Sequence, residues 1–224
     1  MKPILFNTQM VNAILAGNKT CTRRIIKDIS CLPNKYEFLG FCNYDKDGYC
    51  ARFRFKHFFG DLPWLTKVKV PYKEDDVLYV RETWGISNPL GDYAKGNMTA
   101  EYIYKAGYAK GERVSIGRTD EKNLGKWRPS IHMPKAAARL FLKVTSVKIE
   151  RLQDITEDGV KAEGIKPRFD VKDKFSKEIA IQRFRELWDS TVNKKDMDMY
   201  GFDSNPWVWV IEFKRINKEE LINE

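Results

Sequence analysis

The sequence predicts an α+β fold built on a small, mostly antiparallel β-barrel with flanking helices and two long insertions. Stretches with the two-residue period of a strand outnumber stretches with the 3.6-residue period of a helix. The two kinds do not alternate as they do in a parallel, doubly wound sheet, and no internal repeat occurs. Because 224 residues with 42% hydrophobic content suffice for one core, we expect a single domain over 1–224, with insertions at about 27–75 and 85–130.

Three segments carry the signals of helices. Residues 8–15 place apolar side chains at helical spacing after Thr8, a residue type that caps helix N-termini. Residues 157–163 follow a second candidate cap, Thr156, and have acidic side chains in their first turn. We expect the longest helix over 176–190, with a buried side made of Ile181, Phe184, Leu187 and Trp188.

Outside the two insertions, four segments are predicted to be strands. Residues 20–26 are rich in threonine and β-branched side chains, and residues 77–84 alternate apolar with other side chains. A third strand is expected over 140–149. The stretch NPWVWVIEFKRI closes the fold as a fourth strand, with one face formed by Trp207, Trp209, Ile211 and Phe213.

The two insertions differ in character. The first is aromatic and basic, and its stretch CNYDKDGYCARFRF predicts a hairpin that turns at Asp47 and Gly48. The second is rich in Gly, Asn, Asp and Lys and holds one short strand candidate over 101–106, so residues 85–126 are predicted to be a long surface loop.

Basic residues outnumber acidic ones, with 40 Lys and Arg against 31 Asp and Glu and a net charge of +9. Such an excess attracts polyanions, so nucleic acid is the expected partner, and a solvated basic surface without a partner is the alternative. No segment approaches the roughly 20 consecutive apolar residues of a membrane span, and the start of the chain lacks a signal-peptide pattern. We therefore expect a cytoplasmic protein with no membrane association.

Several classes of site are excluded by what the sequence lacks. It has no P-loop, no Gly-rich dinucleotide fingerprint and only two histidines. Ser130 and His132 are only two positions apart, which is no indication of a catalytic dyad. The cysteines fit no standard zinc spacing even with His57 added, and in a reducing compartment they are expected to be free thiols: Cys21, Cys31, Cys42 and Cys50. We expect no metal and no cofactor.

The stretch LAGNKTCTRRI, residues 15–25, contains a candidate catalytic pair, Lys19 and Thr22. Period two places Thr22 and Arg24 on one strand face, while Lys19 lies in the preceding turn. If burial and Arg24 lower the pKa of Lys19, the neutral amine can take the proton of Thr22 and produce a nucleophile, provided that a carboxylate orients the pair. The alternative is structural: Lys19 is a solvated turn residue, the threonines form the strand, and Arg23 and Arg24 are surface charges.

Four stretches spread over most of the chain resemble the ASCH domain family, in particular its larger members in phage and prophage genomes. They are ILAGNKTCTRR, VLYVRETW, LQDITEDGVKAEGI and PWVWVIEF. The distinctive element has the pattern glycine-x-lysine-threonine-x-threonine-x-arginine, formed by Gly17, Lys19, Thr20, Thr22 and Arg24. The resemblance implies a PUA-like β-barrel with a cleft between barrel and flanking helices, and association with RNA or nucleosides.

The resemblance also implies a reaction. Some small ASCH proteins are amidohydrolases that remove the acetyl group from the exocyclic amine of acetylated cytidine, using a lysine, a threonine and a glutamate. The matching positions here are Lys19, Thr22 and Glu163. Thr22 is then the nucleophile, Lys19 accepts and returns the proton, and Glu163 orients Lys19, while Arg24 or a backbone N–H stabilises the oxyanion.

Other ASCH members are RNA-binding or RNA-cleaving. For these, a basic cleft with aromatic platforms matters more than the lysine, threonine and glutamate. Arginines hold phosphates and rings stack on unpaired bases. The candidates for contact with RNA or a modified nucleoside are Arg24, Arg81, Trp84, Trp127, Arg128 and His132. A non-catalytic RNA-binding module is therefore the alternative to a hydrolase. A further alternative is a ribonuclease that uses Lys19 together with an arginine.

Overall fold

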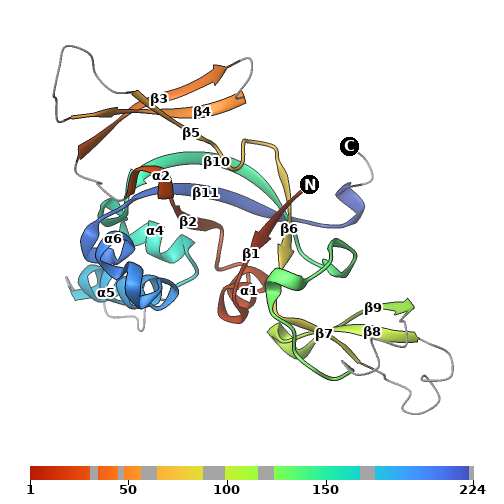
Figure 1. Ribbon diagram of the computed structural model, residues 1–224. Coiled ribbons are helices and arrows are strands. Elements are labelled where there is room, and N and C mark those ends of the chain that lie inside the picture. The colour runs from red at the N-terminus through yellow and green to blue at the C-terminus, as the bar shows by residue number, and fades with distance from the viewer. Residues whose placement is uncertain are drawn as a thin grey trace. The chain divides into compact units, whose positions relative to one another are not determined.

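The computed structural model describes residues 1–30, 35–44, 48–56, 65–87, 99–115, 124–166 and 175–221. The chain divides into two compact units: the first unit comprises residues 1–17, 76–143 and 214–224, and the second unit comprises 18–75 and 144–213. Helices are few and most strand pairs are antiparallel, so the predicted α+β class is confirmed (Figure 1). Within the described residues every sheet is open, and none closes into the expected barrel.

In the first unit, strand β1 (Lys2–Leu5) pairs in parallel with β6 (Val77–Arg81), and the first residues of β10 (Phe141–Arg151) pair antiparallel with β6. The predicted helix 8–15 is confirmed as α1 (Thr8–Leu15), but its cap is not Thr8. Asn7 has the extended backbone of a cap, and its side-chain oxygen accepts a hydrogen bond from the Met10 N–H at 2.8 Å. Thr8 is the first helical residue, because asparagine caps at least as well as threonine.

A second sheet of the first unit consists of β7 (Trp84–Ser87), β8 (Thr99–Tyr104) and β9 (Lys110–Ser115), all antiparallel. The predicted strand 77–84 is wrong at its end, because β6 stops at Arg81 and β7 starts at Trp84. The predicted surface loop over 85–126 is also wrong in part, since these strands have a buried face. That face belongs to a cluster made of Trp84, Ile86, Ala100, Tyr102, Tyr104, Met133, Ala137, Ala138, Phe141 and Ile216.

A buried ion pair lies where β6 ends. The carboxylate of Glu82, which is 1% exposed, accepts hydrogen bonds from Arg139 Nε at 2.8 Å and Arg139 Nη2 at 2.9 Å. The guanidinium also donates to the Ala106 carbonyl and lies 4.2 Å from the centroid of the Tyr104 ring. The pair therefore connects the end of β6 to the segment after β8.

Replacing Glu82 by alanine is expected to lower the free energy of unfolding by about 3–5 kcal/mol, because it leaves the Arg139 guanidinium without its buried counter-ion. Urea unfolding followed by tryptophan fluorescence measures the change. Replacing Glu37, whose pair with Arg54 is largely exposed, is the control and is expected to change the free energy of unfolding far less. Equal losses for the two variants contradict the assigned role of Glu82.

In the second unit, β2 (Cys21–Ile25) pairs antiparallel with β11 (Trp207–Ile216), with Ile211 opposite Thr22. The predicted strands 20–26 and 140–149 are confirmed as β2 and β10 with slightly different ends. Of the expected face of β11, Trp209, Ile211 and Phe213 are buried, while Trp207 is half-buried. Val208 and Val210 on the other face are buried as well. The strand is therefore covered on both faces, which its one-sided aromatic pattern does not predict.

Two helices of the second unit pack beside each other (Figure 1). The predicted short helix is confirmed as α4 (Glu157–Ala162), with the Thr156 side chain accepting a hydrogen bond from the Gly159 N–H at 3.1 Å. The predicted long helix is α5 (Phe175–Thr191). Together with β2 and β11 they bury a cluster made of Cys21, Leu152, Ile155, Val160, Ala180, Phe184, Trp188, Phe202, Val208 and Val210.

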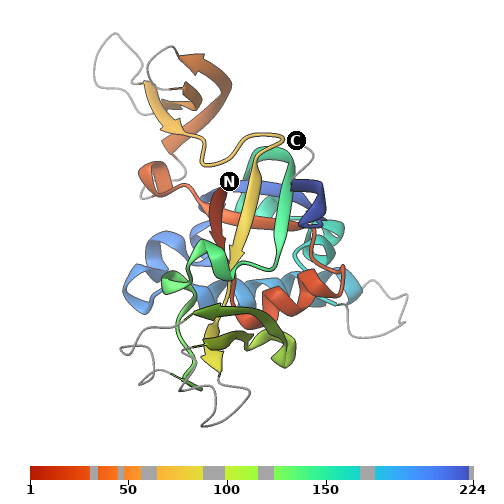
Figure 2. The ribbon, with the colours of Figure 1, turned by 90° about the vertical axis from the view of Figure 1, so that its right-hand side faces the viewer.

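The first insertion forms a sheet of its own within the second unit (Figure 2). Strands β3 (Tyr36–Tyr44), β4 (Gly48–Phe55) and β5 (Leu65–Lys69) are antiparallel, which confirms the predicted hairpin. Gly48 begins β4, while Asp47 lies outside the described residues. Phe53 is fully buried, and its ring lies 5.6 Å from that of Trp207 between centroids, so this sheet packs against β11.

Shorter elements complete the described part of the chain. They are the helices α2 (Lys27–Ser30) and α6 (Met197–Tyr200) and the single 3-10 turns Ala106–Tyr108, Ser130–His132, Lys135–Ala137, Leu152–Asp154, Lys194–Asp196, Phe202–Ser204 and Glu219–Leu221. No helix in the described part of the chain has the length and apolar character needed to cross a membrane.

Candidate functional site

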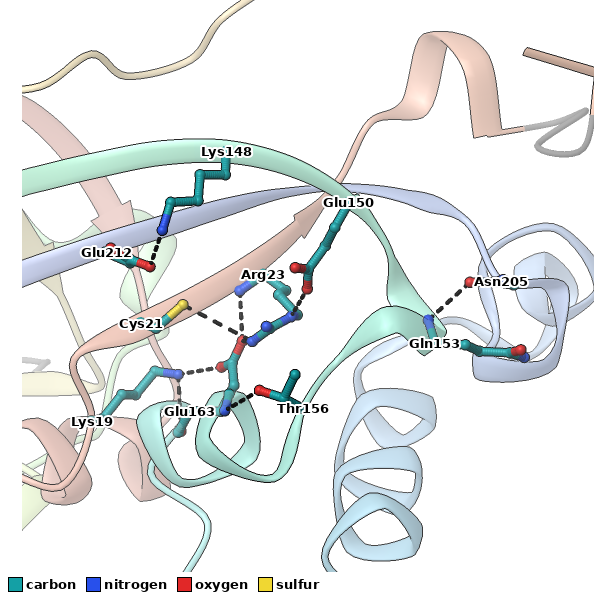
Figure 3. A network of polar contacts seen from close by, with 11 residues as sticks. Lys19, Cys21, Arg23, Lys148, Glu150, Gln153, Thr156, Glu163, Asn205 and Glu212 are labelled. Carbon is teal, nitrogen blue, oxygen red and sulfur yellow. Dashed lines mark hydrogen bonds and ion pairs between the residues drawn. The ribbon is translucent and has the colours of Figure 1, made fainter. Parts of the chain in front are cut away.

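Lys19 and Glu163 meet in the second unit, although 144 positions separate them (Figure 3). Lys19 lies just before β2, and Glu163 is the residue that ends α4. Lys19 Nζ donates to Glu163 Oε2 at 2.5 Å and to the Glu163 carbonyl oxygen at 3.0 Å. The Lys19 side chain is 0% exposed and that of Glu163 is 4% exposed, so the ion pair is shielded from water.

The other carboxylate oxygen of Glu163 binds β2 itself. Oε1 accepts a hydrogen bond from the Arg23 backbone N–H at 2.7 Å. This N–H is available because the Ile26 N–H donates to the Trp207 carbonyl of β11, so the N–H of Arg23, an odd number of positions away on the same strand, is directed away from β11. Glu163 thereby covers the outer edge of β2.

Arg23 completes this group and was missed by the sequence analysis, which left it as a surface charge. Its Nη1 lies 3.3 Å from Glu163 Oε1, and its Nε donates to Glu150 Oε1 at 2.7 Å. The residue is only 8% exposed. Two carboxylates thus neutralise one buried guanidinium. The signal in the sequence was the alternation that places Arg23 beside Cys21, but alternation alone does not say which strand face is buried.

Burial and the neighbouring charges change the acid–base properties of the site. Burial lowers the pKa of Lys19 below its usual value, Arg24 lowers it further, and the carboxylate of Glu163 opposes the shift. Burial also raises the pKa of the Cys21 thiol to about 12, with Glu163 adding to the effect. Cys21 is therefore protonated at neutral pH and unsuited to be a nucleophile.

Thr22 and Arg24 lie on the opposite face of β2 from Cys21 and Arg23, as the two-residue period predicts. Thr22 is 2% exposed and is directly opposite Ile211. Arg24 is half-buried, and burial lowers the pKa of its guanidinium. The structure therefore holds the proposed nucleophile and the proposed oxyanion-binding arginine on one buried strand face, three and five positions after Lys19.

A pocket of about 480 Å³ lies on the Cys21 face of the same strands. Its charged side chains are already paired in part, since Lys148 Nζ donates to Glu212 Oε1 at 2.9 Å and Arg23 contacts Glu150. The described lining residues do not include Lys19 or Glu163. They are Thr20, Cys21, Arg23, Thr145, Lys148, Glu150, Thr156, Asp158, Gly159, Ala162, Val210, Glu212 and Phe213.

The remaining candidates for nucleoside contact all lie in the first unit. Trp84 is 4% exposed and belongs to the core cluster of that unit. Arg128 lies 5.1 Å from the centroid of the Trp84 ring, and the two residues exchange backbone hydrogen bonds. Trp127 is 41% exposed, and His132 is exposed in a 3-10 turn. Arg81 donates from Nε to a backbone carbonyl.

Within the described residues, no three His, Cys, Asp or Glu side chains are grouped so that they could hold a metal ion. Comparisons of the chain with models of protein families, with curated proteins and with solved structures find no match.

Proposed function

We propose that the protein is an ASCH domain of the PUA-like kind that removes the acyl group from an N-acylated, cytidine-type base. The observation that carries this proposal is the contact of 2.5 Å between Lys19 Nζ and Glu163 Oε2. The resemblance assigns both residues to one catalytic group with Thr22. Their meeting across 144 positions of sequence supports that assignment.

The environment of Lys19 suits a general base. An amine accepts a proton only in its neutral form, and burial lowers the pKa of Lys19 toward the range in which that form is populated. Glu163 opposes this shift but fixes the direction of Nζ by accepting one of its hydrogen bonds. Glu163 is therefore a positioning residue, and Lys19 and Thr22 are the groups that react.

The reaction has two steps. Thr22 Oγ bonds to the acyl carbon and its proton goes to Lys19 Nζ; the carbon–nitrogen bond then breaks, and Lys19 returns the proton to the leaving exocyclic amine. A water molecule next attacks the acyl-threonine, loses its proton to Lys19 and releases the carboxylic acid, and the proton returns to Thr22 Oγ. Arg24, on the strand face of Thr22, supplies the positive charge that stabilises the oxyanion.

The test is release of acetate and cytidine from N4-acetylcytidine by the purified protein. We expect turnover by the wild type. Replacing Thr22 by serine keeps a hydroxyl at the same position, so activity is expected to remain within about tenfold, whereas the Thr22→Val variant has no nucleophile and is expected to be inactive. Product formation is measured by chromatography of the nucleosides.

The control is Thr66→Val on β5, a threonine of the same unit outside the catalytic group, which is expected to retain full activity. Thermal unfolding of each variant checks that its fold is intact. A wild type that releases no acetate, or a folded Thr22→Val variant that still does, contradicts the hydrolase. The first result leaves a non-catalytic module that binds RNA.

A further inference from the structure

We infer that Cys42 and Cys50 form a redox-sensitive dithiol, which a peroxide converts to a disulfide between β3 and β4. In the structure both residues are present as thiols. The modification site lies in the sheet that the first insertion forms. Neither cysteine belongs to the proposed catalytic group of Lys19, Thr22 and Glu163, so the dithiol is independent of the hydrolase.

The two cysteines lie directly opposite each other in neighbouring antiparallel strands. Cys42 on β3 is in register with Cys50 on β4, so both side chains lie on the same face of the sheet. The Cys42 thiol donates a weak hydrogen bond to the Cys50 carbonyl oxygen, with Sγ at 3.6 Å from that oxygen. The Cys42 side chain is therefore already turned toward the residue to which it is to be bonded.

The spacing of the two strands at this point suits a disulfide. The Val70 N–H, just after β5, donates to the Tyr49 carbonyl, so the next residue of β4, Cys50, directs its backbone groups toward β3. Opposite residues of this hydrogen-bonded kind have Cα atoms about 5.5 Å apart, within the range of roughly 4.4–6.8 Å that a disulfide spans. Their Cβ atoms are about 1 Å further apart than in a relaxed disulfide, so the bond is strained and readily reduced.

Aromatic contacts on the other face of the sheet hold this register. The Phe41 ring stacks on the Tyr49 ring with 5.2 Å between centroids, and the Phe38 and Phe53 rings lie 5.4 Å apart. A slip of one residue turns every side chain of a strand to the opposite face and breaks both contacts. The two thiols therefore stay opposed in the folded protein, which favours their reaction with each other over reaction with another chain.

Exposure decides which thiol reacts first. Cys42 is half-buried and Cys50 is 2% exposed, so a peroxide in solution reaches Cys42. Cys42 Sγ bonds to one oxygen of hydrogen peroxide, the O–O bond breaks, and water leaves while Cys42 becomes a sulfenic acid. Cys50 Sγ then bonds to that sulfur, the S–O bond breaks, and the hydroxide leaves as a second water with the Cys50 proton. The two sulfurs together lose two electrons, which reduce the peroxide to water.

The test is treatment of the protein with excess hydrogen peroxide, in a Cys31→Ser background that removes one alternative partner. The remaining thiols are then alkylated, and a tryptic digest is analysed by mass spectrometry without reduction. Trypsin cleaves after Lys46, between the two cysteines, so their disulfide appears as a linked pair of peptides, residues 36–46 and 47–52. A parallel sample is reduced with dithiothreitol before alkylation.

We expect the linked pair of peptides as the main product, and dithiothreitol is expected to restore both thiols. Cys21 is expected to remain a thiol, because it is 3% exposed and lies opposite Glu212 instead of another cysteine. The single variants test the order of the steps. Cys50 in the Cys42→Ser variant is expected to react at least about tenfold more slowly than Cys42 in the Cys50→Ser variant, since burial keeps the peroxide from it.

The matched control is Cys42→Ser/Asn43→Cys in the same background, which moves the first thiol by one position to an exposed site on the other face of β3. The separation along the chain is nearly unchanged, so a linkage that needs only a flexible hairpin forms in both proteins. A linkage set by the strand register is expected only with the natural pair. Equal linkage in the control, persistence of both natural thiols in excess peroxide, or a disulfide between two chains in place of the internal one overturns the inference. Circular dichroism checks the fold of each variant.

Discussion

Replacing Lys19 by arginine is expected to reduce acetate release by about 10³-fold, the contribution typical of a positioned general base. The guanidinium keeps the positive charge and the donors that face Glu163, but it stays protonated and cannot accept the proton of Thr22. The rate is measured under saturating N4-acetylcytidine, and a thermal scan of the same sample reports the fold.

Arg23→Lys is the matched control, because Arg23 pairs with the same carboxylate but takes no part in proton transfer. Its activity is expected to remain within about tenfold. In the wild type, activity is expected to rise with pH and to level off below the usual lysine value of 10.5, since the neutral amine is the active form and its pKa is lowered. A Lys19→Arg variant with more than a tenth of the activity, or a rate that is flat with pH, contradicts the assigned base.

Replacing Glu163 by alanine is expected to lower the free energy of unfolding by about 3–5 kcal/mol, because it leaves buried cations without their counter-ion. The Lys19 side chain is 0% exposed and that of Arg23 is 5% exposed, so water cannot replace the carboxylate at either. The backbone N–H of Arg23 loses its acceptor as well. Chemical unfolding in urea measures the loss.

Glu212→Ala is the control for this prediction. Its pair with Lys148 has nearly the same length, but the side chains are 40% and 62% exposed. An exposed pair of this kind contributes about 0–1 kcal/mol. Similar losses at Glu163 and Glu212 would show that burial does not set the strength of the Glu163 contacts.

Most of the helices and strands with strong local signals were predicted at the right place, with errors at some of their ends. Thr156 caps α4 as expected. The threonine and the acidic residues that indicate this cap lie within about one helical turn of one another, so no distant part of the chain is needed to predict it. The cap of α1 was misplaced by one residue, since Asn7 and Thr8 both suit that position. In the second insertion the strand candidate over 101–106 corresponds to β8, whereas β9 was predicted as loop because the polar residues 110–115 show no apolar alternation.

The residues of the candidate site also divide into those that the local sequence indicates and those that it does not. Lys19 and Thr22 belong to one short stretch that composition already singled out. Glu163 was reached only through the family resemblance, because nothing local connects residues 144 positions apart. Arg23 was missed because β2 is buried on both faces, with Thr22 at 2% and Arg23 at 8% exposure. Alternation predicts a solvent face for such a strand, and only tertiary packing removes it.

Glu163 also affects whether another copy of the protein can add a strand to the edge of β2. The edge of β2 that faces away from β11 has backbone groups of the kind on which another chain can add a strand. At Arg23 that position is occupied by the Glu163 carboxylate, and at Lys19 by a backbone bridge to Glu163. The carboxylate that holds the Lys19 ammonium thus also protects this edge of the sheet from strand addition, so its loss is expected to promote association as well as unfolding.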